Sequence, residues 1–226
     1  MIVIFRRASL VLSALYCACQ TAQAAFIHDG SGNLELRNFY FDRDFHGDSA
    51  TQSRRSEWAQ GFMLRLQSGY TDGVVGFGLD AAGMLGLKLD SSPDRSGSGL
   101  LPRGSDKRAA DDYAKAVATF KARLAQSELK AGGLSPQLPL LASNSSRLFP
   151  QWFNGVQLVS KDLDRFTFTL LQVNATKLRD STDYEDLTAM AQQGAYLATV
   201  TSDRLRYAGV DYQPLNNLTL SLHTSV

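Results

Sequence analysis

A stretch of sixteen residues with two distinct faces, Val74 to Leu89, limits what this chain of 226 residues can fold into. Large apolar residues dominate its odd-numbered positions, whereas glycine, alanine and two charged residues occupy most of the even-numbered ones. Because successive side chains of a strand point to opposite faces, the pattern predicts one long, two-faced strand. Strands of soluble sheets average about 5–6 residues, whereas a strand that crosses a bilayer at a slant needs about 9–11 residues and an apolar face toward lipid. The stretch therefore favours a transmembrane strand over a strand of a soluble β-sandwich with a glycine-rich outer face.

The N-terminus has the layout of a secretory signal peptide. Two basic residues, Arg6 and Arg7, precede an apolar run that ends in a small-x-small cleavage site at Ala22-Gln23-Ala24. We therefore expect residues 1–24 to be removed on export, leaving residues 25–226 as the exported domain. Both cysteines of the chain lie in this leader, so the exported domain has neither a disulfide nor a cysteine ligand for a metal.

The charge balance gives no support for a nucleic-acid partner. The leader holds two of the 23 basic residues, so 21 basic and 22 acidic residues remain, a net charge of −1. A protein that binds nucleic acid through its phosphates needs an excess of basic residues. No stretch reaches about 18 consecutive apolar residues, so no membrane-spanning helix is predicted either.

The same period-two alternation recurs along the chain, and about nine strands are predicted in all. In Tyr113–Ala125 this period fits better than a helical one, although alanine, lysine and arginine also favour helix. The remaining strands are expected at Leu34–Phe41, Trp58–Tyr70, Glu128–Gly132, Gly155–Ser160, Phe166–Lys177, Leu205–Gln213 and Leu218–Ser225.

The connections between these strands alternate between short and long. Thr71-Asp72-Gly73 is a tight turn, with glycine where a positive φ is needed. The long connections are the polar stretches Asp42–Glu57, Asp90–Asp112 and Asp180–Arg204, the last with an expected helical turn near Tyr184–Ala191. Short turns at one end and long loops at the other are typical of outer-membrane barrels. Aromatic residues near strand ends fit the interfacial girdles of such a barrel, namely Trp58, Tyr70, Tyr113 and Tyr212.

An ordered set of short stretches resembles the OprD family of outer-membrane porins. Together they extend along the exported domain at compatible spacings: Leu36–Asp44, Trp58–Phe62, Ser68–Thr71, Val75–Asp80, Leu85–Asp90, Asp111–Tyr113 and Ser146–Gln151. The resemblance implies an all-β, antiparallel transmembrane barrel of about 18 strands in the Gram-negative outer membrane. It also implies a monomer, surrounded by outer-membrane lipid, that admits small carboxylate-bearing solutes such as amino acids and aromatic or organic acids.

The resemblance further implies which residues form the transport path. In this family the third external loop folds into the lumen and narrows it, and Leu134–Asn154 matches that loop. The family also has basic side chains along the lumen, and Arg43, Arg55 and Arg147 correspond to such arginines by position. Strand alternation, taken by itself, turns four more basic residues toward the same side: Arg37, Arg65, Lys121 and Arg123. An arginine fork fits a carboxylate bidentately and stays charged at any relevant pH, so rings of such residues select anions.

Other readings of the same residues remain open. The chain ends inside an expected strand and without a terminal aromatic residue, which predicts the N-terminal half of a porin or a non-functional truncated fragment. A secreted, soluble β-sandwich that acts as a binding or adhesion module would also keep the leader and the strands. An enzyme is not predicted, because His28, His46 and His223 are not arranged with a serine and an acid, or with metal-ligand spacing. No cofactor, metal or Ca²⁺ loop is predicted.

Overall fold

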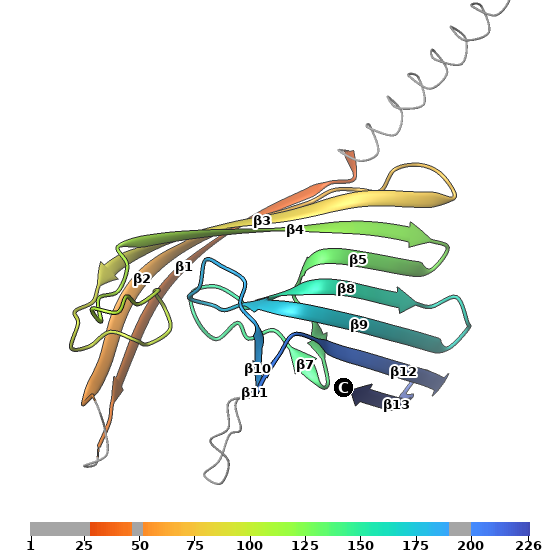
Figure 1. Ribbon diagram of the computed structural model, residues 1–226. Coiled ribbons are helices and arrows are strands. Elements are labelled where there is room, and N and C mark those ends of the chain that lie inside the picture. Colours follow the sequence, from red (N-terminus) through yellow and green to blue (C-terminus); the bar gives the residue numbers. More distant parts are fainter. Residues whose placement is uncertain (1–27, 47–51, 190–199) are drawn as a thin grey trace, which may run out of the picture.

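Nine long strands form one curved antiparallel sheet in the computed structural model, which describes residues 28–46, 52–189 and 200–226 (Figure 1). The sheet order is β1-β2-β3-β4-β5-β8-β9-β12-β13. The predicted leader, residues 1–24, lies outside the described residues. The strands are β1 (Ser31–Asp44), β2 (Arg54–Gln67), β3 (Val75–Asp90), β4 (Asp112–Leu124), β5 (Ser127–Leu134), β8 (Trp152–Ser160), β9 (Phe166–Lys177), β12 (Leu205–Leu215) and β13 (Leu218–Ser225).

The all-β prediction and the positions of the nine strands are confirmed. Two strands, Phe166–Lys177 and Leu218–Ser225, match residue for residue, and the others differ mainly by a few residues at their ends. The alternative of a helix at Tyr113–Ala125 is wrong, since this segment is β4, paired with β3 along its whole length. A soluble sandwich would pack two sheets face to face, whereas all nine long strands belong to one sheet.

Two small hairpins in the loops were not predicted. One pairs β6 (Gln137–Leu138) with β7 (Leu141–Ala142), and the other pairs β10 (Leu187–Ala189) with β11 (Val200–Ser202).

The second hairpin replaces the helical turn expected at Tyr184–Ala191, which is wrong over the described residues 184–189. Glu185 exchanges two backbone hydrogen bonds with Thr176, and Leu187 is buried against the sheet. These tertiary contacts outweigh the local helix propensity.

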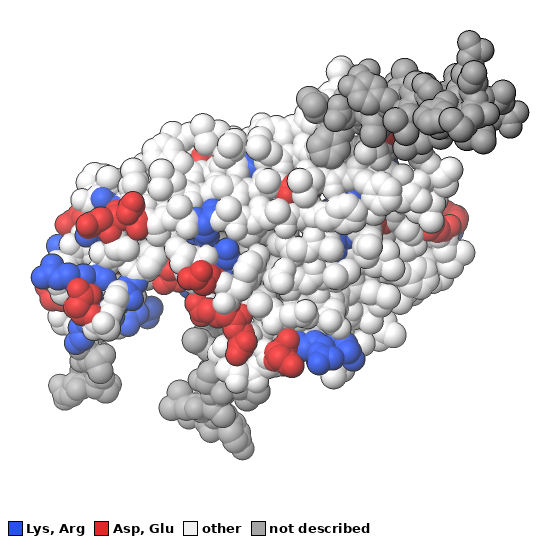
Figure 2. Space-filling view, turned by 45° about the horizontal axis from the view of Figure 1, so that its top comes forward, with Lys and Arg blue, Asp and Glu red and all other residues white. Residues whose placement is uncertain are grey.

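The sheet has an apolar outer face and an inner face that the loops partly cover. On β3, Phe77 and Leu79 are 46% and 49% exposed, whereas Gly76 and Gly78, which alternate with them, are buried. Figure 2 shows a broad surface with little charge and with Lys, Arg, Asp and Glu gathered mainly at one end and along the lower rim. Other large apolar side chains exposed on the outer face are Leu34, Leu36, Tyr40, Leu64, Leu66, Leu85, Phe120, Leu129, Val156, Phe168, Leu170, Leu220 and Leu222. An exposed apolar surface of this extent is typical of a face that lipid covers.

The two ends of the sheet differ in their connections, as the sequence predicts. At one end, here called the turn end, the strands are joined by residues 68–74, 125–126, 161–165 and 216–217. At the other, the loop end, they are joined by residues 45–53, 91–111, 135–151 and 178–204. In outer-membrane barrels the short turns face the periplasm and the long loops face outward. In the described part of the chain, no helix has the length and apolar character needed to cross a membrane.

The aromatic girdle prediction is half right. Trp58 is 42% exposed on the outer face, and Tyr212 stacks on Phe166 at the turn end with 4.5 Å between ring centroids. Tyr70 and Tyr113 lie on the inner side instead. Tyr113 is 6% exposed in the buried cluster, where its hydroxyl donates to the carbonyl of Leu100, and Tyr70 lies under the basic side chains of β4.

Candidate functional site

The loop of residues 135–151, between β5 and β8, packs on the inner face of the sheet. Its Leu148 and Phe149 are each 1% exposed and belong to a buried cluster with side chains of β2, β3 and β4. A Cβ added at Gly61 would lie only 3.0 Å from both of them, so glycine on β2 makes room for the loop. This contact explains why a loop of this kind is rich in leucine and aromatic residues. Its role as a constriction of a lumen stays a prediction.

Arg147 projects from this loop and is held by backbone carbonyls. Its Nε donates to the carbonyl of Ser98 and its Nη1 to that of Ser146, both at 2.8 Å. The guanidinium carbon lies 4.7 Å from the ring centroid of Phe41 on β1, a cation–π distance. Burial lowers the pKa of Arg147, and the positive charge of Arg179 adds to this effect. Since the ordinary pKa of arginine is above about 12, Arg147 stays charged at neutral pH.

Arg43 and Arg55 lie directly opposite each other on β1 and β2. Like charges in this position repel, but the ring of Phe45 accepts both cations, at 5.0 Å from Arg43 and 5.2 Å from Arg55. The buried Nε of Arg55 has no hydrogen-bond partner in the described part of the chain. An unsatisfied buried donor of this kind is costly unless a ligand or water fills it.

Arg179, which follows β9, completes this group, and the sequence alone did not single it out. Its Nη1 donates to Ser146 Oγ at 2.9 Å, next to Arg147. An added Cβ at Gly99 would lie 3.8 Å from Arg179 and 3.9 Å from Arg147, so the two guanidinium groups lie close to each other, with a carboxylate oxygen of Asp180 also 3.8 Å from that Cβ. We call Arg43, Arg55, Arg147 and Arg179 the loop-end arginines. The one available signal for Arg179 was its place just after a strand that ends at the loop end.

The four basic residues assigned by alternation also lie on the inner face, but three of them form ion pairs with two acidic residues. Glu35 binds both Arg37 and Arg65, the latter at 3.0 Å. Asp80 lies 2.6 Å from Lys121. Arg123 lies over the ring of Tyr70 at 4.3 Å.

Arg37 has a second role, because it holds the loop itself. Its Nη1 donates to the carbonyl of Arg147 at 2.6 Å. The structure therefore brings Arg43, Arg55 and Arg147 together at the loop end, places Arg37 and Arg65 on the wall beneath them, and leaves Lys121 and Arg123 toward the turn end.

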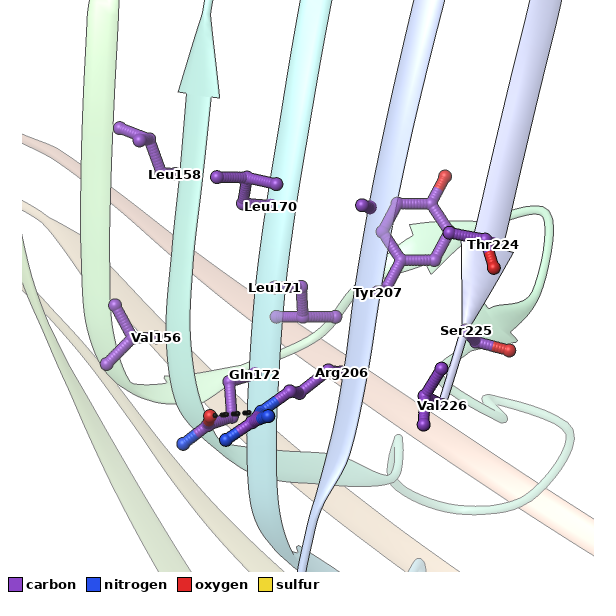
Figure 3. Close-up of a pocket in the computed structure, with 11 residues that line it drawn as sticks. Val156, Leu158, Leu170, Leu171, Gln172, Arg206, Tyr207, Thr224, Ser225 and Val226 are labelled. Atoms are coloured by element: carbon purple, nitrogen blue, oxygen red, sulfur yellow. Dashed lines mark hydrogen bonds between the residues drawn. The ribbon is translucent and has the colours of Figure 1, made fainter.

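An apolar hollow of about 540 Å³ lies elsewhere, on the outer face near the last strand (Figure 3). Val156, Leu158 and Leu170 line it, and at its edge Arg206 donates to the side-chain oxygen of Gln172 at 3.1 Å. Its apolar lining continues the surface that we assign to lipid, so we do not place a solute there.

His223 has acidic and aromatic partners but no nucleophile. Its Nε2 lies 3.3 Å from Asp211, and its Nδ1 lies 2.7 Å from the hydroxyl of Tyr207. Ser221 binds the same Asp211 and not the imidazole, whereas a serine triad needs the imidazole between serine and acid. Over the described ranges, no group of three or more His, Cys, Asp or Glu is placed to hold a metal ion.

The comparison with known proteins decides the family. A family profile described as outer membrane porin, OprD family, matches residues 24–226. The chain belongs to the OprD family. It is accordingly a protein of the Gram-negative outer membrane, which accounts for the apolar outer face.

This OprD-family chain matches only part of the length of each relative. The porin-like protein GalP of Pseudomonas putida is 36% identical over 194 residues, which is 86% of this chain and 46% of GalP. The crystal structure of OccK9 (OpdG) of Pseudomonas aeruginosa is 45% identical with a TM-score of 0.82, covering 89% of this chain and 51% of OccK9. OpdK of the same organism, solved with vanillate, is 39% identical with a TM-score of 0.76, covering 89% and 49%. The chain thus spans about half the length of the relatives it matches.

Proposed function

We propose that this chain forms part of the wall of a monomeric porin through which small carboxylate-bearing solutes diffuse passively. The loop of residues 135–151 narrows the passage, and the loop-end arginines attract the carboxylate there. One observation carries this proposal. Among the described residues, none of the loop-end arginines makes an ion pair, whereas Arg37, Arg65 and Lys121 all do.

Unpaired arginines beside aromatic rings have the chemistry that an aromatic or aliphatic carboxylate requires. The planar guanidinium donates two parallel hydrogen bonds to the carboxylate, and the rings of Phe41 and Phe45 lie next to these guanidinium groups. Vanillate, present in the structure of the related OpdK, is a carboxylate on an aromatic ring. Several moderate sites in series suit transport, because a solute has to leave each site as readily as it enters.

The test uses the complete product of the gene that encodes this chain, purified in detergent and inserted into a planar bilayer. We measure the reversal potential in a KCl gradient and the block of the K⁺/Cl⁻ current by benzoate. Arg147→Ala is expected to lower anion selectivity and to weaken benzoate block by about tenfold or more, the effect of losing one charged hydrogen-bond partner.

Arg206→Ala is the matched control, since it removes the same charge from the outer face. It is expected to leave both readings unchanged. If Arg147→Ala behaves like Arg206→Ala and uptake of every tested carboxylate stays at the wild-type rate, the proposed role of Arg147 is wrong.

A further inference from the structure

The sheet has a break beside β4, where β5 leaves the wall. β4 pairs with β3 from Asp112 to Leu124, but with β5 only from Thr119 to Leu124. β5 departs at Gly132, whose φ of +112° is a conformation that chiefly glycine adopts. Figure 1 shows β4 continuing toward the loop end past the point where β5 turns away. Backbone groups left unpaired at such a break need other partners.

Lys115 projects from β4 into this break. Its side chain is 5% exposed, and its Nζ donates to three carbonyls: 2.9 Å to Leu178, 2.9 Å to Arg179 and 3.3 Å to Pro150. An ammonium group has three protons to donate, so the three acceptors match its capacity. Its Nζ also lies 5.7 Å from the ring centroid of Phe149.

The three carbonyls belong to two different loops that carry two of the loop-end arginines. Pro150 lies in the inward loop three residues after Arg147, and Leu178 and Arg179 begin the loop between β9 and β12. The buried side chain of Lys115 on the wall therefore holds the backbone of both loops.

We propose that Lys115 is a positioning residue that keeps Arg147 and Arg179 side by side at the constriction. It does not touch the solute, because it is buried beneath the loops. The inference rests on the proposed function, since it assigns a cause to the geometry of that same site. Mutation of a residue that contacts no ligand, but is coupled to the site, changes affinity by about two- to thirtyfold.

Lys177 offers a matched control on the same face. It is 7% exposed, and its Nζ donates at 3.2 Å to the carbonyl of Ala116, a residue of the wall strand β4 and not of a loop. Replacing Lys115 or Lys177 by methionine removes one buried amino group and keeps a similar volume. Lys177 meets one of the loops through the ring of Tyr184, 4.5 Å from its Nζ, but only Lys115 donates hydrogen bonds to the backbone of both loops.

The experiment compares Lys115→Met, Lys177→Met and Arg147→Ala in the complete gene product, by bilayer recording with benzoate as the probe and by heat-modifiable gel mobility as a check of barrel folding. Lys115→Met is expected to weaken benzoate block by about three- to tenfold and to increase open-channel current noise. Lys177→Met is expected to change neither. In an Arg147→Ala, Arg179→Ala background, Lys115→Met is expected to add little, because its effect passes through those arginines.

The outcomes separate this inference from the proposed function. If Arg147→Ala weakens benzoate block while Lys115→Met leaves block and noise unchanged, the positioning role is wrong and the proposed function stands. If the Arg147→Ala, Arg179→Ala pair leaves block and selectivity unchanged, both are wrong. Should Lys115→Met not yield a folded barrel, Lys115→Gln replaces it. The glutamine side chain keeps one amide group as a donor, so its effect on benzoate block is expected to lie between those of wild type and Lys115→Met. Wild-type block and current noise in Lys115→Gln would overturn the inference.

Discussion

The anchoring of the inward loop by Phe149 gives the sharpest quantitative prediction. Phe149 is 1% exposed, meets Tyr113 edge-to-face with 5.4 Å between ring centroids, and lies over Gly61 of β2. Phe149→Ala removes this ring and leaves a cavity between the loop and the sheet.

The expected cost is that of a buried phenylalanine, about 3–5 kcal/mol, of which the aromatic pair accounts for about 0.5–1.5 kcal/mol. The strands do not depend on this ring for their pairing, so the cost applies to docking of the loop. Leu148, the Arg37 bond to the carbonyl of Arg147 and the Lys115 bond to that of Pro150 remain. Because 1.4 kcal/mol corresponds to a factor of ten, the undocked population rises by about two orders of magnitude or more.

Hydrogen exchange of the complete protein in detergent measures this population directly. Amides of residues 135–151 are expected to lose about a hundredfold protection, while those of β3 and β4 keep theirs. Phe168→Ala is the control, because it also removes a phenylalanine ring, but one that is 37% exposed on the outer face, opposite the face on which the loop packs. Loop protection within a few-fold of wild type in Phe149→Ala would refute the assignment of Phe149 as the main anchor.

Two further predictions concern the outer face and a turn. Leu170→Arg places a charge on the lipid side, where Leu170 is 52% exposed, and is expected to cost up to about 2–4 kcal/mol of folding free energy. The control, Gln157→Arg, places the same charge on the inner face of the neighbouring strand and is expected to be tolerated. Equal folding yields for the two variants in lipid vesicles would contradict the assignment of faces. Asp162 in the turn between β8 and β9 has a pKa below its usual 3.8 because the hydroxyl of Ser127 and the N–H of Gln126 bind its carboxylate. Its contribution to stability is therefore complete above the usual pKa and disappears as the pH falls through the lowered value. Asp162→Asn is expected to be less stable than wild type at pH 7, with a difference that shrinks as the pH falls below the usual pKa of 3.8. A difference that stays constant through this acid range in denaturant titrations shows that the carboxylate charge is not what matters.

The sequence by itself determined the strands, the two faces of the sheet and the difference between its ends. These features are local, since alternation in Val74–Leu89 and Tyr113–Ala125 follows from strand geometry and needs no knowledge of neighbours. The same rule correctly turned Arg37, Arg65, Lys121 and Arg123 toward the inner face. The girdle prediction, which rested on position near a strand end and not on alternation, erred for Tyr70 and Tyr113, because proximity to a strand end does not say which face a ring occupies.

Only the tertiary structure decided which charges are neutralised and which stay free. Lys121 meets Asp80 because β3 and β4 pair in one register, and Lys115 meets Leu178 across 63 residues of sequence. Arg179 lies beside Arg147 because two loops fold onto the same part of the sheet, and Gly61 leaves the space that one of them needs. Such contacts depend on the paths of distant segments. A local pattern places a side chain on a face but does not choose its partner there.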